Sequence, residues 1–139
     1  MTMFLITEEI INPNNIELEF PSSKVGAKSI FEGIVRDNNL GQAVRKLEYQ
    51  CYKELAIKEG SLILKEALTK YKVDDVFCIH RTGKLEIGET AVLVRVLAAH
   101  RDDSFQGCRY IIDEVKKRVP IWKKEIYKSG ESNWLKGAG

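Results

Sequence analysis

The chain has 139 residues, of which 44% are hydrophobic and 30% are charged, and its formal net charge is +2. This length suits one domain, 1–139, that buries roughly two thirds of the surface of its unfolded chain. Such a small net charge does not indicate a nucleic-acid-binding protein, so any basic site must be local. The N-terminus lacks a basic segment followed by a long apolar run, and no stretch could cross a bilayer. We therefore expect a cytoplasmic protein without a membrane segment.

The apolar patterns predict an α+β fold with a mostly antiparallel sheet and two main helices. Alternating or apolar segments predict strands at 3–6, 16–20, 27–36, 44–52, 76–81, 90–100 and 121–127. A turn-forming segment joins the third and fourth of these strands, which predicts a hairpin. The segments 53–71 and 105–119 carry apolar residues at every third and fourth position and are predicted to be helices. We predict a turn at 82–89 and a loosely ordered tail from about 128, apart from Trp134.

Cysteine and histidine usage indicates no metal site. Cys51, Cys78 and Cys108 are widely spaced and lie among apolar residues, so they are predicted to be small core residues. The two histidines, His80 and His100, are isolated from each other, and no histidine pair has metal-ligand spacing. The sequence also contains no phosphate-binding loop, dinucleotide-binding glycine motif or nucleophile elbow.

The segment around Pro120 contains the two lysines of greatest interest. Pro120 ends the second predicted helix because proline disfavours helical backbone in the residue before it. Lys116 falls on the apolar stripe of that helix beside Ile112, where loss of hydration favours a neutral amine that can exchange protons or attack. Alternatively, Lys116 extends past the core edge, with its ammonium near the carbonyls at the helix C-terminus. Lys123 follows in the last strand and faces a cleft if Trp122 is the buried neighbour.

Other basic side chains stand at the ends of predicted strands. Arg36 ends one strand, and two others end in the dipeptide His-Arg, at His80 and at His100. Asp102 is expected to cap the second helix, which places Arg101 beside a helix N-terminus where an anion could bind. A structural role is favoured for His80 and left open for His100. Together these cations suit a small polyanionic substrate.

Five motifs carry a resemblance to a known family. They are Phe31-Glu-Gly-Ile-Val-Arg36, Leu47-Glu-Tyr-Gln-Cys-Tyr52, Ile79-His-Arg-Thr-Gly-Lys-Leu-Glu-Ile-Gly-Glu89, His100-Arg-Asp-Asp-Ser-Phe105 and Lys116-Lys-Arg-Val-Pro-Ile-Trp-Lys-Lys-Glu125. In this order they resemble the large, catalytic subunits of molybdopterin synthase, over about residues 26–134.

The resemblance implies an α/β-hammerhead fold and a sulfurtransferase of molybdenum cofactor biosynthesis. Similar proteins form a homodimer at the centre of a heterotetramer, and each binds a small ubiquitin-like subunit. The Gly-Gly tail of that partner ends in a thiocarboxylate, whose sulfur converts cyclic pyranopterin monophosphate to molybdopterin. The large subunit needs no metal or redox cofactor.

The resemblance also implies a role for particular residues. Lys116 would be the principal catalytic lysine, and Lys123 would assist it. The substrate phosphate and pterin would be bound by Arg36, His100 and Arg101. Phe31 and Ile112 would line the passage for the partner's tail. A lysine at this position could stabilise the oxyanion of an acyl-linked intermediate and supply the proton that the departing oxygen needs.

The chain departs from the family pattern at several positions. Gln50, Leu55 and Ser104 stand where glutamate, methionine and alanine are usual. Ala138 stands where similar proteins send an arginine into the neighbouring protomer's anion site, and Lys136 would be a weaker replacement. This departure leaves open a non-catalytic scaffold for the same partner. A small RNA-binding domain with Trp122 as a stacking platform is a further alternative, against which the near-neutral charge argues.

Overall fold

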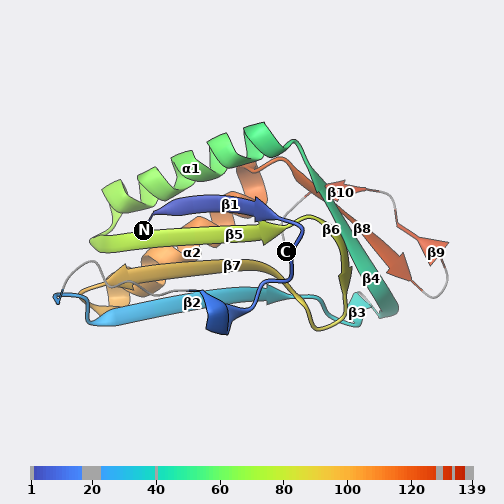
Figure 1. The fold of residues 1–139 in the computed structure, drawn as a ribbon, viewed down its shortest axis with the longest axis horizontal. Coiled ribbons are helices and arrows are strands. Elements are labelled where there is room, and N and C mark those ends of the chain that lie inside the picture. The colour runs from blue at the N-terminus through green and yellow to red at the C-terminus, as the bar shows by residue number, and fades with distance from the viewer. Residues whose placement is uncertain (1, 17–22, 40, 128–129, 133, 137–139) are drawn as a thin grey trace.

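The computed structural model describes residues 2–16, 23–39, 41–127, 130–132 and 134–136. Its described residues form two long helices and two mostly antiparallel sheets (Figure 1), which confirms the predicted α+β class. None of the helices in the described part of the chain has the length and apolar character that crossing a membrane requires.

The first sheet has the strand order β1-β5-β7-β2. Its strands are β1 (Met3–Thr7), β5 (Val73–Arg81), β7 (Thr90–Ala98) and β2 (Ala27–Ile34). The β1–β5 pair is parallel and the other two pairs are antiparallel. All nine residues of β7 are buried, as its nearly continuous apolar run predicts for a central strand. β2 is one edge of this sheet.

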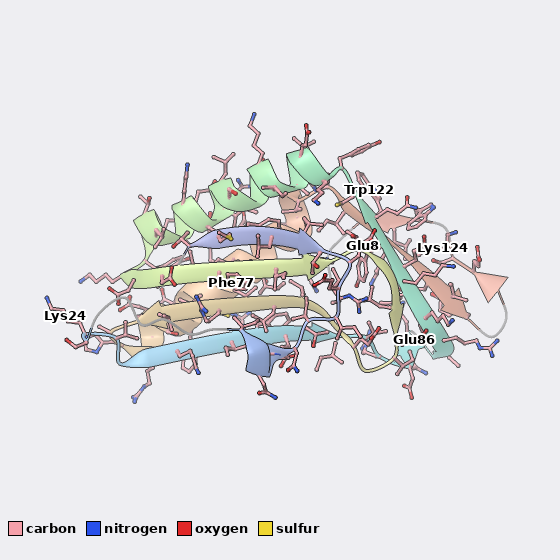
Figure 2. All side chains as sticks on the ribbon, viewed as in Figure 1. Glu8, Lys24, Phe77, Glu86, Trp122 and Lys124 are labelled. Atoms are coloured by element: carbon pink, nitrogen blue, oxygen red, sulfur yellow. The ribbon has the colours of Figure 1, made fainter. Side chains whose placement is uncertain are left out.

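The second sheet is built on β4 (Gln42–Cys51) and β8 (Ile121–Tyr127), which pair antiparallel. Shorter strands complete it: β3 (Asn38–Asn39) and β6 (Gly83–Glu86) pair with β4, and β9 (Gly130–Glu131) and β10 (Leu135–Lys136) pair with β8. Trp122 of β8 is half-buried, with its ring 5.4 Å from the ring of Tyr52 (Figure 2).

Both helices cover one face of the first sheet. α1 (Lys53–Lys70) contacts β1 and β5, and α2 (Arg101–Arg118) contacts β7 and β2. Gly60 permits a close approach of α1 to β1, because a Cβ atom at this position would lie 2.4 Å from the ring of Phe4. The opposite face of the sheet carries a smaller apolar cluster of Phe77, Leu93 and Ile11, with Phe77 labelled in Figure 2.

Local patterns predicted the elements well. Both helices agree with their predicted spans to within a few residues, and α2 ends at Arg118, with Val119, the residue before Pro120, as its C-cap. The strands observed as β1, β2, β4, β5, β7 and β8 also overlap their predictions. The predicted strand 16–20 lies mostly outside the described residues.

Three local predictions are wrong. The strands at 27–36 and 44–52 do not form a hairpin, since β2 pairs with β7 and β4 with β8. The predicted turn at 82–89 contains β6. Asp102 lies in the first turn of α2, and His100 is its N-cap residue. The first two errors arise because strands pair with partners distant in sequence, which local turn composition cannot specify.

Candidate functional site

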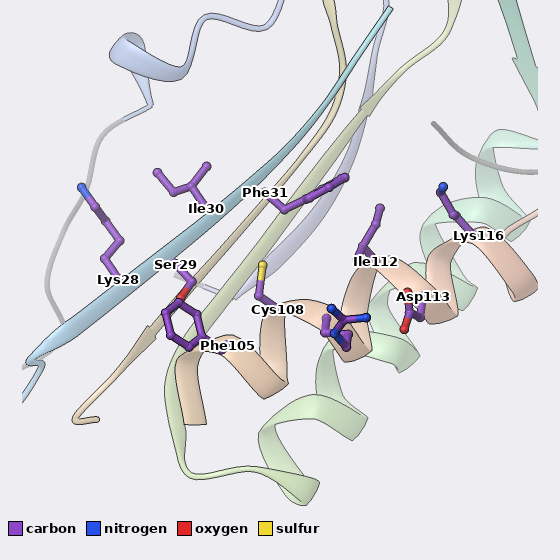
Figure 3. A pocket seen from close by; sticks show the side chains of 10 residues that line it. Lys28, Ser29, Ile30, Phe31, Phe105, Cys108, Ile112, Asp113 and Lys116 are labelled. Carbon is purple, nitrogen blue, oxygen red and sulfur yellow. The ribbon is translucent and has the colours of Figure 1, made fainter. Parts of the chain in front are cut away.

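A groove of about 790 Å³ lies between the edge strand β2 and helix α2 (Figure 3). Residues 28–31 of β2 line one side, and α2 residues from Phe105 to Lys116 line the other. We call it the β2–α2 groove. Lys28 and Phe105 lie at one end of the groove, and Lys116 lies at the other.

The groove brings together three of the predicted site residues, Phe31, Ile112 and Lys116. Phe31 is 37% exposed, Ile112 is 8% exposed, and Lys116 belongs to the exposed residues. The prediction that Lys116 lies on a buried stripe is therefore wrong. Val115 takes the core position with no exposed surface, and the next residue is rotated by about 100° to the rim of the groove.

Cys108 also lines the groove, a role that its apolar surroundings in the sequence did not indicate. Its side chain is buried, as predicted for a small core residue. Burial raises the pKa of the Cys108 thiol to about 11, although a hydrogen bond from the Phe31 backbone opposes this rise. The thiol is therefore almost entirely protonated near neutral pH. Its place one helical turn before Ile112, on the same face, is the signal that could have identified it.

A second, smaller pocket of about 70 Å³ contains Arg36 and Lys123 together with Glu125. Glu125 is 2% exposed and accepts hydrogen bonds from the Asn39 amide, at 2.8 and 2.9 Å, and from the Tyr127 hydroxyl, at 2.6 Å. Burial raises the pKa of Glu125, but these hydrogen bonds and the charge of Lys123 outweigh it and hold the pKa below its ordinary value. The Lys123 ammonium lies 3.7 Å from this carboxylate, which orients the lysine side chain.

The last two predicted residues, His100 and Arg101, line neither pocket; they lie one helical turn from Phe105, at the end of the groove away from Lys116. Arg101 opens α2 and Lys116 lies in its last turn, so fifteen residues, or about 22 Å of helix axis, separate them. Arg36 is also remote from His100. It follows the C-terminal end of β2, whereas the N-terminal residue of that strand, Ala27, pairs with Ala98 near His100. One copy of the chain therefore does not bring all the predicted cations together.

His80 has the structural role that the sequence favoured. Its side chain is fully buried, and Nδ1 lies 2.6 Å from the carbonyl oxygen of Arg81. Burial lowers the pKa of His80 to about 4, so the ring is neutral at pH 7 and Nδ1 donates this hydrogen bond. Arg81 is held in turn by the carboxylate of Glu89 at 3.1 Å.

The fold and the groove define a family of enzymes. A family model described as MoaE protein matches residues 6–118, so the chain belongs to the MoaE family. This confirms the family that the five motifs indicated, and with it an enzyme of molybdenum cofactor biosynthesis.

The relatives include proteins named molybdopterin synthase catalytic subunit. The relative from Pyrococcus abyssi is 50% identical over 116 residues, covering 84% of this chain and 78% of its own. The relative from Thermoplasma volcanium is 40% identical over 129 residues, covering 93% of this chain and 94% of its own.

Two solved structures share the fold. The molybdopterin synthase from Staphylococcus aureus superposes with a TM-score of 0.88 at 34% identity, over 97% of this chain and 98% of its own. A complex of subunits 1 and 2 of molybdopterin-converting factor from Helicobacter pylori superposes with a TM-score of 0.76 at 19% identity, over 96% of this chain and 88% of that one.

Proposed function

We propose that this chain is the sulfur-transferring subunit of a molybdopterin synthase. Its sulfur donor is the C-terminal thiocarboxylate of a small ubiquitin-like partner, and its substrate is cyclic pyranopterin monophosphate. The observation that carries the proposal is Lys116 at the end of an open groove that can take an extended chain.

Lys116 performs the central chemistry in this proposal. Attack of the thiocarboxylate sulfur on the pterin side chain leads to an acyl-linked species, whose hydrolysis passes through a tetrahedral oxyanion. The Lys116 ammonium stabilises that oxyanion and donates the proton for the departing oxygen. Lys116 is exposed in the chain alone. A tail and a substrate that fill the groove exclude water from it, and this strengthens the interaction of the ammonium with developing negative charge.

Lys123 and Arg36 bind the substrate in this proposal. The two side chains share the second pocket, and the Glu125 carboxylate orients the Lys123 ammonium. An arginine beside a lysine suits a phosphate, because the guanidinium donates two parallel hydrogen bonds and the ammonium adds a mobile charge.

His100 and Arg101 serve the site of a second copy of the chain in this proposal. About 22 Å of helix separates them from Lys116, so one phosphorylated pterin cannot contact both ends. A homodimer, as the family resemblance implies, brings one copy's His100 and Arg101 to the other copy's lysines. The RNA-binding alternative has less support, because the edge contact between Trp122 and Tyr52 occupies part of the ring surface that stacking would need.

Reconstitution with the thiocarboxylated partner and the cyclic pterin tests the proposal. We expect Lys116→Ala to lower turnover by about a hundredfold or more, with little change in partner affinity. Lys117→Ala is the matched control, since Lys117 is exposed, lies outside the groove and contacts Glu114 at 3.6 Å. Wild-type chain that binds the partner but forms no molybdopterin would identify a scaffold instead. Full activity in Lys116→Ala would remove this lysine from the mechanism.

Mixing two inactive variants tests the shared site. A dimer of one Lys116→Ala copy and one Arg101→Ala copy retains one intact site if Arg101 acts across the interface. Random mixing would then restore about a quarter of wild-type activity at low substrate concentration. No recovery would place Arg101 in its own copy's site or outside the site.

A further inference from the structure

The second pocket contains a carboxylate beside its cations. In the described part of the chain, the charged residues that line it are Arg36, Lys123 and Glu125. Glu125 is 2% exposed, whereas the Lys123 side chain is 28% exposed. A buried carboxylate competes with an anionic substrate for the neighbouring cations. Its hydrogen-bond partners therefore decide whether those cations stay available to a substrate.

Neutral donors supply the hydrogen bonds of the Glu125 carboxylate. The Asn39 amide donates to both of its oxygens, at 2.8 and 2.9 Å, and the Tyr127 hydroxyl donates to Oε2 at 2.6 Å. The Lys123 ammonium stays 3.7 Å from Oε1. A direct hydrogen bond between an ammonium and a carboxylate is shorter, at about 2.7 to 2.9 Å. The ammonium is therefore held near Glu125 by charge without donating a hydrogen bond to it.

Asn39 belongs to the same short segment as Arg36. This segment leads into β3, which turns tightly into β4. Gly41 permits the turn with a φ of 83°, and its N–H donates to the Asn38 side chain at 3.1 Å. The turn thus fixes the place of Asn39. Its contact with Glu125 joins the segment of Arg36 to β8, the strand that carries the second cation of the pocket.

We propose that Asn39 is a positioning residue that acts through Glu125 to keep the Lys123 ammonium available to the substrate. This inference rests on the proposed function, in which Lys123 and Arg36 bind the substrate, and adds the residue that prepares their pocket. Without the Asn39 amide, the buried carboxylate lacks its main neutral donor. The Lys123 ammonium, only 3.7 Å away, then closes on Glu125 and is withdrawn from the substrate.

The substrate affinity of Asn39→Ala tests the proposal. We expect its Kd for cyclic pyranopterin monophosphate, measured by calorimetry, to rise about tenfold or more, because a charged hydrogen bond to the substrate is lost. Ser132→Ala is the matched control. The Ser132 hydroxyl accepts a hydrogen bond from the Glu125 backbone N–H at 2.9 Å, and Ser132 does not line the pocket. An unchanged Kd in Asn39→Ala, or an equal rise in both variants, would refute the proposal.

Proton exchange of the Lys123 ammonium provides a readout without substrate. In NMR spectra of the wild-type chain these protons should exchange with water too fast to be observed near neutral pH. In Asn39→Ala the direct bond to Glu125 should slow the exchange and make the signal visible, with Lys123→Arg as the assignment control. A protected ammonium in the wild-type chain would show that Lys123 is already bonded to Glu125 and would overturn the proposal.

A second variant and a separate assay complete the test. If Asn39→Ala does not fold, Tyr127→Phe removes the other neutral donor and should raise the Kd about threefold or more, and an unchanged Kd would refute the proposal. Molybdopterin formation is measured separately. Product from the wild-type chain, together with unchanged substrate affinity in Asn39→Ala, would refute only the positioning role. Substrate affinity that depends on Asn39, without product from the wild-type chain, would refute only the proposed function.

Discussion

Acidification between pH 7 and pH 5 should weaken the fold through His80. The folded state keeps this fully buried ring neutral, because burial lowers the pKa of His80 from 6.5 to about 4. In the unfolded chain the ring regains its ordinary pKa, so below pH 6.5 the unfolded state binds more protons than the folded state. The free energy of unfolding therefore falls as the pH falls from 6.5 toward 4. These two pKa values give a loss of about 2 kcal/mol between pH 7 and pH 5.

Denaturant unfolding at pH 7, 6 and 5, followed by circular dichroism, measures this loss. Removing the ring in His80→Gln should lower stability at pH 7 and abolish most of the pH dependence in this range. His100→Gln is the matched control, since His100 is exposed and its removal should leave the dependence intact. If His80→Gln does not fold, the His80 ring resonances of the wild-type chain, followed by NMR, should not titrate above pH 5. A stability that stays constant from pH 7 to pH 5 would refute the reasoning.

Three further predictions concern packing, charge and thiol reactivity. Gly60→Ala should cost about 2 kcal/mol of unfolding free energy in thermal or urea unfolding, because the new methyl group overlaps the Phe4 ring, and Phe4→Leu should restore part of it. Arg118→Gln should lower the free energy of unfolding by about 2 kcal/mol at pH 7, because the guanidinium of Arg118 holds the pKa of Glu66 at about 2. The difference in stability from wild type should shrink as the pH falls from 4.5 toward 2. A difference that stays constant would contradict the pairing. Alkylation of Cys108, followed by peptide mass spectrometry, should accelerate about tenfold per pH unit up to about pH 11, whereas levelling near pH 9 would indicate an ordinary exposed thiol.

The helices could be predicted from the sequence because their signals are local. The apolar residues of α1 and α2 recur at helical spacing along each segment, and Pro120 marks the end of α2. Strand pairing could not be predicted in the same way. The segments around β2 and β4 look like a hairpin, but β2 finds its partner about sixty residues further along the chain. Side-chain alternation tells which face is apolar but does not identify the strand that lies alongside.

For the candidate site, too, local sequence features could be predicted but the spatial grouping of residues could not. The five motifs predicted the individual site residues, but their grouping depends on the fold. The groove joins Phe31 of an edge strand to Ile112 and Lys116 of a distant helix, while His100 and Arg101 occupy that helix's other end. The error about Lys116 came from treating the apolar stripe as uniformly buried, whereas Val115 and Val119 are fully buried and Lys116 between them is exposed.

The open edge of β2 makes this chain prone to aggregation when it is produced in the cell. Ile30, Phe31 and Ile34 leave 43%, 37% and 55% of their surfaces exposed along that edge. Such an edge attracts any other extended chain, including a misfolded neighbour of the same sequence. Copies of the chain that accumulate in the cell therefore have a route to aggregation through this edge. An occupant that covers the edge would protect the solubility of the chain.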